Sequence, residues 1–239
     1  RDAQFRHINE TAEEYMENGF PVISIDCKKK ENIGNFKNSG AEYAKKGNPV
    51  NVLDHDFPLP DKGKAAPYGV YDIAANEGFV NVGVSSDTAQ FAVNSIRSWW
   101  DEMGKPRYPG AIRLLITADG GGSNGSHSRL WKFELQKFAD ERGLEIEVCH
   151  FPPGTSKWNK IEHRLFSQIT KNWRGRPLET LEIIVNLIAS TTTDNGLVVR
   201  CKADTAIYPK GTKVSDKGFA GINLLRNEFH PDWNYVIRP

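Results

Sequence analysis

Apolar and polar positions along the chain follow two alternating periods. Short apolar runs with a period of two alternate with longer stretches whose apolar residues recur every three or four positions. Strands are predicted at 20–26, in a hairpin over 68–84, at 112–119, at 144–151 and near 197–203. Helices are predicted at 10–18, 87–104, 128–143, 158–173 and 178–193. This order favours an α/β fold, a mixed sheet with helices on its faces.

Turn and cap residues predict where several elements begin and end. Asp87 is the expected N-cap of its helix, and Gly104 and Gly143 are expected to end the helices before them. The hairpin turn is placed at 76–78. Four tryptophans at helical spacing are assigned to the core: Trp99, Trp100, Trp131 and Trp173.

Three regions are predicted along the chain. Residues 1–19 form a helical lead-in, 20–195 a core domain, and 196–239 a C-terminal extension packed on that core. The segment 28–64 is polar and rich in Gly and Lys, and is interpreted as an insertion or an irregular hairpin extension.

A carboxylate lies at an unusual place in the helix predicted after residue 157. Apolar residues recur every four positions, and Trp158 and Phe166 widen their stripe; the four are Ile161, Leu165, Ile169 and Trp173. Glu162 lies inside or at the edge of this stripe. An ionised carboxylate facing the core is costly unless a cation meets it, so we expect Glu162 to have a cationic partner.

Two further carboxylates stand at strand ends. Asp26 ends the strand 20–26, and Asp119 ends the strand 112–119. Ligand sites of α/β sheets gather at the carboxyl ends of parallel strands. Three converging carboxylates repel each other, and oxygen ligands suit Mg²⁺ or Mn²⁺. Taken singly, each residue also has a structural interpretation, as a turn former, a loop cap or a helix-border residue.

The glycine run "GGGSNG" directly after Asp119 has two interpretations. It resembles a phosphate-binding loop only weakly, because it lacks the spacing of the known nucleotide motifs. We prefer a tight strand-to-helix turn that clears space beside Asp119.

Charge is unevenly distributed, although the formal net charge is only +1. Residues 151–176 carry six Lys or Arg against one acid, which indicates an anionic partner. The candidate DNA-phosphate contacts are Lys157, Lys160, Arg164 and Lys171. Trp158 is interpreted as core, with stacking on a nucleobase as the alternative. For the basic residues the alternative is a solvated helix face.

The remaining composition narrows the class of protein. The three cysteines are widely spaced and form neither a disulfide framework nor a zinc pattern, which favours a reducing cytoplasm. His127, His150 and His163 lack the spacing of a zinc site. No apolar run approaches the roughly 18 residues of a membrane span.

Three blocks carry a resemblance to a known family. "VISIDCKKKENIGNFKN", "LLITADGGGSNG" and "HFPPGTSKWNKIEHRLFSQI" resemble bacterial insertion-sequence transposases of the DDE type, specifically the ISAzo-type family. The segment with Pro152-Pro153 and Asn159 to Glu162 is also distantly similar to mariner-like transposases. The likeness runs over most of residues 20–235.

The resemblance implies a ribonuclease-H-like catalytic core with Asp26, Asp119 and Glu162 as the triad. It implies two Mg²⁺ or Mn²⁺ ions on these carboxylates and phosphodiester cleavage and strand transfer at insertion-sequence ends. The partners implied are transposon-end and target DNA, bound by a homodimer, in the bacterial cytoplasm at the nucleoid. A family member is also expected to have an upstream DNA-binding region.

Two other interpretations stay open at this point. One is a catalytically silent relative that binds DNA without cutting it. The other is a phosphotransferase of the sugar-kinase or actin type, which the residues after Asp26, Cys27-Lys28-Lys29, do not favour because such kinases have a Gly-rich turn there.

Overall fold

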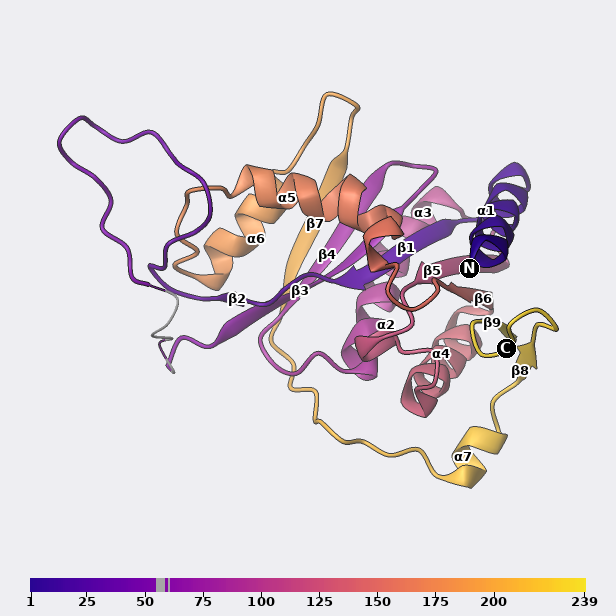
Figure 1. Ribbon diagram of the computed structural model, residues 1–239. Coiled ribbons are helices and arrows are strands. Elements are labelled where there is room, and N and C mark those ends of the chain that lie inside the picture. The colour runs from indigo at the N-terminus through magenta and orange to yellow at the C-terminus, as the bar shows by residue number, and fades with distance from the viewer. Residues whose placement is uncertain (55–58, 60) are drawn as a thin grey trace.

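The computed structural model describes residues 1–54, 59 and 61–239 (Figure 1). These residues contain nine strands in one sheet, ordered β7-β4-β3-β1-β5-β6-β9-β8, with β2 paired to β3 beside this path. The strands are β1 (Val22–Cys27), β2 (Glu31–Asn32), β3 (Lys64–Asp72), β4 (Glu77–Gly83), β5 (Arg113–Ala118), β6 (Glu145–His150), β7 (Val198–Asp204), β8 (Leu224–Arg226) and β9 (Asn234–Ile237).

Helices connect these strands, and short π and 3-10 turns flank several of them. The α-helices are α1 (Asp2–Glu17), α2 (Ala89–Trp99), α3 (Lys105–Arg107), α4 (Arg129–Arg142), α5 (Ser167–Asn172), α6 (Leu181–Ala189) and α7 (Asp216–Ala220). The π turns are η1 (Trp100–Gly104) and η4 (Glu162–Phe166), and the 3-10 turns are η2 (Gly122–Asn124) and η3 (Ser156–Trp158). Within the described ranges, no helix is both long and apolar enough to cross a membrane.

The sheet carries helices on both faces, as predicted. Helices α2 and α4 cover one face, while α1, α5 and α6 cover the other (Figure 1). Strands β1, β5 and β6 run parallel to each other, and β1 is antiparallel to β3. The mixed α/β architecture is therefore confirmed.

The two faces bury separate sets of apolar side chains. Trp99, Trp100 and Trp131 lie in the core under α2 and α4. Trp173 packs on the opposite face with the apolar stripe predicted for the helix after residue 160, which is fully buried: Ile161, Leu165 and Ile169. Each such burial contributes about 1.5–3 kcal/mol. The four tryptophans are core residues, as predicted.

Two predicted helix ends differ from the structure. The N-cap of α2 is Thr88, whose Oγ1 accepts a hydrogen bond from the Phe91 N–H (3.4 Å), and not Asp87. Gly104 does not end its helix, because it keeps a right-handed helical φ and the chain continues through η1 into α3. A Cβ at Gly104 would lie 2.7 Å from the Trp100 ring, so glycine is there for close packing.

Other boundaries shift by a few residues. The first helix begins at Asp2 rather than at residue 10. The hairpin turn comes before Glu77, which already belongs to β4, and Asn76 takes the positive φ of 54°. Gly143 ends α4 in the left-handed conformation (φ 64°), as predicted.

The polar segment after β1 is partly tied to the sheet. Its short strand β2 pairs with β3, and Asn38 donates to the backbone of Trp173 and Arg176 beyond α5. Most of the stretch "HDFPLPD" assigned to this segment lies outside the described residues. The residues after 196 supply β7 at one edge of the sheet and β8 and β9 at the other.

One glycine couples the sheet to the Glu162 turn. Gly69 pairs with Asp26 across β3 and β1, and a Cβ there would lie 2.5 Å from Phe166 and 2.7 Å from Ile161. We expect Gly69→Ala to lower the free energy of unfolding by about 1–3 kcal/mol, because two packed side chains would have to move.

Urea unfolding of Gly69→Ala, of a control variant and of wild type tests this prediction. Gly110→Ala is the matched control, since a Cβ at Gly110 meets no atom within 4 Å. Equal stability of the two alanine variants would contradict the tight contact at Gly69.

Candidate active site

Asp26 and Asp119 lie side by side at the carboxyl ends of two parallel strands. Ile25 of β1 pairs with Ala118 of β5, so the next residue of each strand is one of the two aspartates. Side chains alternate along a strand. Asp26 therefore shares the face of Ser24, which is the face that α5 covers. The backbone N–H of Cys27 donates to Asp26 Oδ1 (2.7 Å).

Glu162 is brought to the same place by the residues just before it. Asn159 is fully buried, and its Nδ2 donates to the carbonyl oxygen of Ile25 (2.9 Å), while its Oδ1 accepts a short hydrogen bond from Ser24 Oγ. Ser24 Oγ in turn accepts from the N–H of Ile161 (3.0 Å). Glu162 follows as the first residue of η4, and π turns occur often at functional sites.

Two other carboxylates influence the titration of Asp26. Burial and the negative charges of Asp119 and Glu162 together raise the pKa of Asp26 to about 8, against a lowering by the Cys27 N–H. The Asp26 carboxyl also shares a hydrogen bond with Glu162. Burial raises the pKa of Asp119 as well, opposed by hydrogen bonds from Asn124 and Gly121.

The glycine run forms a turn that holds Asp119. Asn124 Nδ2, at the end of η2, donates to both Asp119 Oδ1 (3.0 Å) and the Asp119 carbonyl oxygen (3.1 Å). Gly122 begins η2 with a φ of +62°, which favours glycine. These contacts fit the preferred interpretation, a tight turn beside Asp119.

The three histidines have different environments. His127 and His163 are exposed, whereas His150 is fully buried at the end of β6. Its Nδ1 lies 2.9 Å from the carbonyl oxygen of Asp119. Burial lowers the pKa of His150 to about 4. His150 is therefore neutral at physiological pH and supports the backbone of a site residue.

The donor set fits a hard divalent cation. Such an ion stabilises the charged form of a buried carboxylate like Asp26, and Mg²⁺ and Mn²⁺ prefer oxygen ligands. In the part of the chain that the structure describes, no group of three or more His, Cys, Asp or Glu side chains is already assembled as a metal cage. The carboxylates instead interact in pairs through Asp26.

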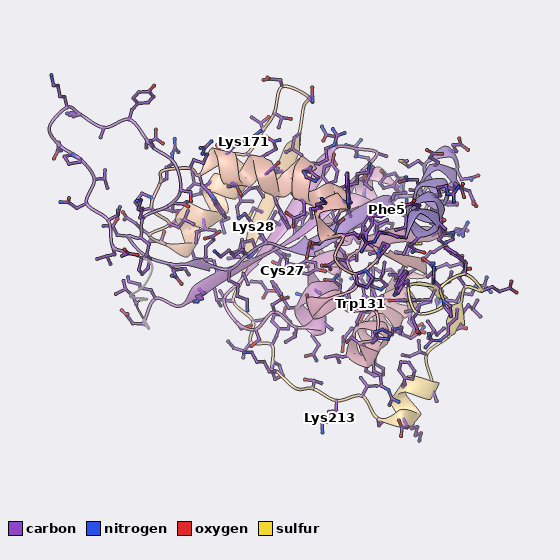
Figure 2. All side chains as sticks on the ribbon, viewed as in Figure 1. Phe5, Cys27, Lys28, Trp131, Lys171 and Lys213 are labelled. Carbon is purple, nitrogen blue, oxygen red and sulfur yellow. The ribbon has the colours of Figure 1, made fainter. Side chains whose placement is uncertain are left out.

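A basic cleft opens beside Glu162. It has a volume of about 500 Å³, and its lining includes Lys28, Lys29, Lys157 and Glu162. Lys28 lies just beyond β1, near the helix that carries Lys171 (Figure 2), and its Nζ is 4.7 Å from the centre of the Trp173 ring. Lys28 also forms an ion pair with Glu31 at 3.3 Å. Lys29 and Lys157 are exposed.

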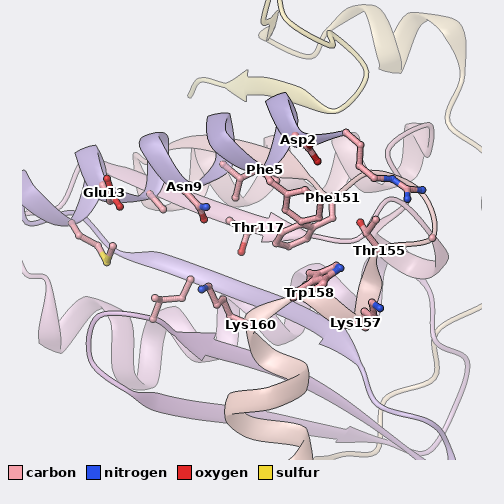
Figure 3. A pocket seen from close by; sticks show the side chains of 16 residues that line it. Asp2, Phe5, Asn9, Glu13, Thr117, Phe151, Thr155, Lys157, Trp158 and Lys160 are labelled. Atoms are coloured by element: carbon pink, nitrogen blue, oxygen red, sulfur yellow. The ribbon is translucent and has the colours of Figure 1, made fainter.

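A second cavity, of about 670 Å³, lies between α1 and the turn that precedes Glu162 (Figure 3). Trp158 and Lys160 line it opposite Phe5. Trp158 is 57% exposed, so its assignment to the core is wrong. The physical reason is that η3 and the extended Asn159 interrupt the helical period, and Trp158 falls out of phase with the stripe.

The five predicted DNA contacts are thus not all in one place. Lys157 lines both cavities, whereas Trp158 and Lys160 line only the one against α1. Arg164 and Lys171 are exposed but line neither of the two, and the charge of Arg164 acts on Tyr71 of β3.

Comparison with known families decides what kind of domain this is. A family model described as the Rhodopirellula transposase DDE domain matches residues 1–239. The chain belongs to this DDE transposase family. Membership confirms the family resemblance and implies the use of a divalent metal. It also agrees with the predicted ribonuclease-H-like α/β fold class.

Solved structures of a mariner transposase are similar at low identity. The Mos1 mariner paired-end complex with Mn shares 15% identity, covering 67% of this DDE domain and 44% of that chain, with a TM-score of 0.42. The Mos1 paired-end complex with the left transposon end shares 14%, covering 73% and 48%, with a TM-score of 0.44. The matches span less than half of each solved chain. A search of curated proteins gave no match.

Several residues of this candidate site were not singled out from the sequence. Asn124, Asn159 and Ser24 hold the carboxylates in place, and Lys29 joins Lys157 in the basic cleft. The sequence carries a signal for only some of them. Asn159 lies three residues before Glu162 within a quoted motif, and Lys29 follows Asp26 in a run of lysines.

The raised pKa of Asp26 predicts how stability depends on pH without metal. Its pKa rises from 3.8 to about 8 on folding, so ionisation destabilises the folded wild type progressively between pH 4 and pH 8. Asp26→Asn removes this loss. We expect the variant to gain stability over wild type, on the order of 2 kcal/mol more at pH 8 than at pH 5.

Urea unfolding in EDTA at several pH values measures this difference. His150 contributes the opposite slope between pH 4 and pH 6.5, but equally in both proteins, so it cancels in the difference. If the free energy of unfolding depended on pH in the same way in both proteins, the pKa of Asp26 would not be raised by folding.

Proposed function

We propose that this domain is the catalytic core of a DNA transposase that cleaves a phosphodiester bond at an insertion-sequence end and transfers the freed strand. The observation that carries the proposal is the convergence of Asp26, Asp119 and Glu162 at one strand-end edge, with Asp26 in contact with a second carboxylate. In the first step water attacks the phosphorus, the bond to the 3′ oxygen of the element breaks, and that oxygen leaves as a 3′-OH. In the second step this 3′-OH attacks a phosphodiester of target DNA, and the 3′ oxygen of the target strand leaves.

The three carboxylates are the proposed ligands of two Mg²⁺ or Mn²⁺ ions. When bound, such ions supply charge stabilisation at the attacking and leaving oxygens of an in-line displacement. The residues of the chain hold the ligands in place: Asn124 fixes the Asp119 carboxylate, and Asn159 fixes the turn that carries Glu162. Because the pKa of Asp26 is about 8, its carboxyl group is largely protonated near neutral pH, and a cation that binds there displaces that proton.

The basic cleft beside Glu162 is the proposed path of a DNA strand. Lys29 and Lys157 are far apart in the sequence, because Lys29 follows β1 and Lys157 lies in η3. Both nevertheless line the same cleft. Phosphates in this cleft would pass next to Glu162. We also propose that Lys160, Arg164 and Lys171 contact phosphates further along, and that exposed Trp158 stacks on a base rather than packing in the core.

Partners and domain limits follow from the same proposal. The domain binds transposon-end DNA and then target DNA, and joining two ends calls for a homodimer on DNA. Its place of action is the bacterial nucleoid. The limits 1–19, 20–195 and 196–239 are retained as the proposed regions.

The two alternatives are less well supported. The catalytically silent relative is disfavoured because all three carboxylates are present and adjoin. The sugar-kinase or actin type is disfavoured because the glycine run makes a short turn that hydrogen-bonds Asp119 through Asn124. Family membership also favours a transposase over both.

Asp119→Asn tests the metal site directly. We expect wild type to bind Mn²⁺ in calorimetry and to nick DNA in its presence, and the variant to lose at least about 100-fold in nicking because one charged ligand is gone. Far-UV circular dichroism checks that the variant is folded. Wild-type protein that binds Mn²⁺ without nicking would favour the silent relative, and absence of Mn²⁺ binding even with DNA would refute the carboxylate site.

The salt dependence of DNA binding tests the basic cleft. We expect Lys29→Ala/Lys157→Ala to weaken binding and to reduce the slope of log K against log salt by about 1–2, because up to two phosphate contacts are lost. Fluorescence anisotropy over a salt series gives the slope. The same direction of change is expected for Lys160→Ala/Arg164→Ala, the further proposed phosphate contacts.

Lys105→Ala is the matched control for these variants. Lys105 is exposed in α3, on the connection that leads to the amino end of β5, opposite the strand ends that carry the carboxylates. An unchanged slope in the Lys29/Lys157 variant would contradict a strand path through this cleft.

A further inference from the structure

A chain of buried hydrogen bonds reaches the Asp119 backbone from the α4 face of the sheet. Trp131 of α4 donates its Nε1–H to the Tyr235 hydroxyl (2.8 Å), and that hydroxyl lies 3.0 Å from His150 Nε2. His150 Nδ1 lies 2.9 Å from the carbonyl oxygen of Asp119. The three side chains are at most 1% exposed. They pack on the α4 face of the sheet, opposite the face that carries the carboxylates.

The direction of every hydrogen bond in this chain is fixed by chemistry. A carbonyl oxygen only accepts, so His150 Nδ1 must carry the proton. Complete burial keeps the imidazole neutral, so Nε2 has no proton and must accept. The Tyr235 hydroxyl is then the donor to Nε2, and its oxygen accepts from Trp131, which can only donate.

The Asp119 carbonyl lies where the strand ladder ends. The last backbone hydrogen bond at this point runs from the Phe151 N–H to the Ala118 carbonyl oxygen (2.8 Å). The next carbonyl, that of Asp119, is held by side chains instead: His150 from behind and Asn124 from the turn. Two donors from different directions fix the plane of that peptide.

We propose that His150 and Tyr235 are positioning residues that set the orientation of the Asp119 peptide, and through it the Asp119 carboxylate. Neither side chain touches the reacting atoms. The inference rests on the proposed function, because it assigns the purpose of the relay to the carboxylate site. Substitution of a residue that orients a metal ligand in this way typically changes metal affinity or activity by about 10–100-fold.

Residues near both ends of the described chain hold His150, the middle member of the Tyr235–His150–Asp119 relay. The His150 N–H donates to the carbonyl oxygen of Trp233 (2.8 Å), and Gln4 Nε2 donates to the His150 carbonyl oxygen (2.9 Å). Gln4 and Asn234 exchange two further hydrogen bonds through their amides, of 2.7 and 2.9 Å. His150 is thus held between α1 and β9.

Two variants that break the same Trp131–Tyr235 hydrogen bond separate positioning from stability. Tyr235→Phe also removes the donor to His150 Nε2, which leaves the imidazole held only through its Nδ1 contact with the Asp119 carbonyl oxygen. Trp131→Phe leaves the Tyr235–His150–Asp119 links intact. We expect both to lose thermal stability. Only Tyr235→Phe should lower Mn²⁺ affinity and the kcat of nicking, each about tenfold, with KM for DNA unchanged.

Substitutions of His150 provide the rescue test. His150→Asn places an amide donor near the position of Nδ1, whereas His150→Leu keeps bulk and removes the donor. We expect the Asn variant to recover most of the Mn²⁺ affinity that the Leu variant loses. ¹⁵N NMR of the imidazole should show the proton on Nδ1 in wild type and in Tyr235→Phe, because the Asp119 carbonyl oxygen accepts from it in both.

The outcomes distinguish this inference from the proposed function. Equal Mn²⁺ affinity and kcat in Tyr235→Phe and Trp131→Phe, or a wild-type proton on Nε2, would overturn the relay while wild-type nicking upholds the transposase. Wild-type protein that neither binds Mn²⁺ nor nicks would overturn the proposed function and the relay's purpose with it, leaving the NMR tautomer to report on the hydrogen bonds alone.

Discussion

The hydrogen bonds between Asn159 and β1 decide where Glu162 stands relative to Asp26. Asn159 binds the strand at Ser24 and Ile25, immediately before Asp26, and Glu162 follows three residues later. Asp26 and Glu162 lie far apart along the chain. The hydrogen bonds of Asn159 to β1 are therefore what fixes the position of Glu162 relative to Asp26. The buried stripe of η4 and α5 then presses the same segment onto β3 and β4. The hydrogen bonds of Asn159 set the position of this segment, and burial of its apolar side chains supplies the free energy that holds it on the sheet.

Packing holds carboxyl groups close together. Burial and the charges of Asp119 and Glu162 raise the pKa of Asp26 to about 8, so the fold opposes a negative charge there. A fold that relaxed this strain by turning Glu162 outward would lose the buried contacts of Ile161 and Leu165, which flank it. The carboxyl groups whose ionisation costs stability are thus also the proposed ligands of a divalent ion.

Much of the fold could be predicted from hydrophobic periodicity, because periods of two and near four survive in a single sequence. The stripe on Ile161, Leu165 and Ile169 is buried as predicted. The failures have local causes. Trp158 lies outside the helix since η3 breaks the period, and Thr88 rather than Asp87 caps α2. Neither break leaves a mark in hydrophobic pattern, because both depend on backbone geometry.

The candidate site was predictable in its carboxylates and much less so in their supports. Asp26 and Asp119 could be placed because each directly ends an apolar run. Asn124 and Asn159 are ordinary polar residues in loops, and only tertiary contact reveals that they bind Asp119 and β1. His150 lacks any spacing signal, since its partners come from a different helix and from the last strand of the sheet.

Two side chains divide the work of holding Asp119. From the turn after β5, Asn124 binds both the side chain and the carbonyl oxygen, so this contact alone would let the peptide and the carboxylate rotate together. From the end of β6, His150 binds only the carbonyl oxygen, and its Nε2 is held by Tyr235 of β9. A rotation that satisfied Asn124 would break the bond to His150. The orientation of the Asp119 carboxylate is consequently the one that satisfies both contacts. Because His150 is held by Gln4 and Tyr235, residues near both ends of the described chain influence this orientation without touching the carboxylate.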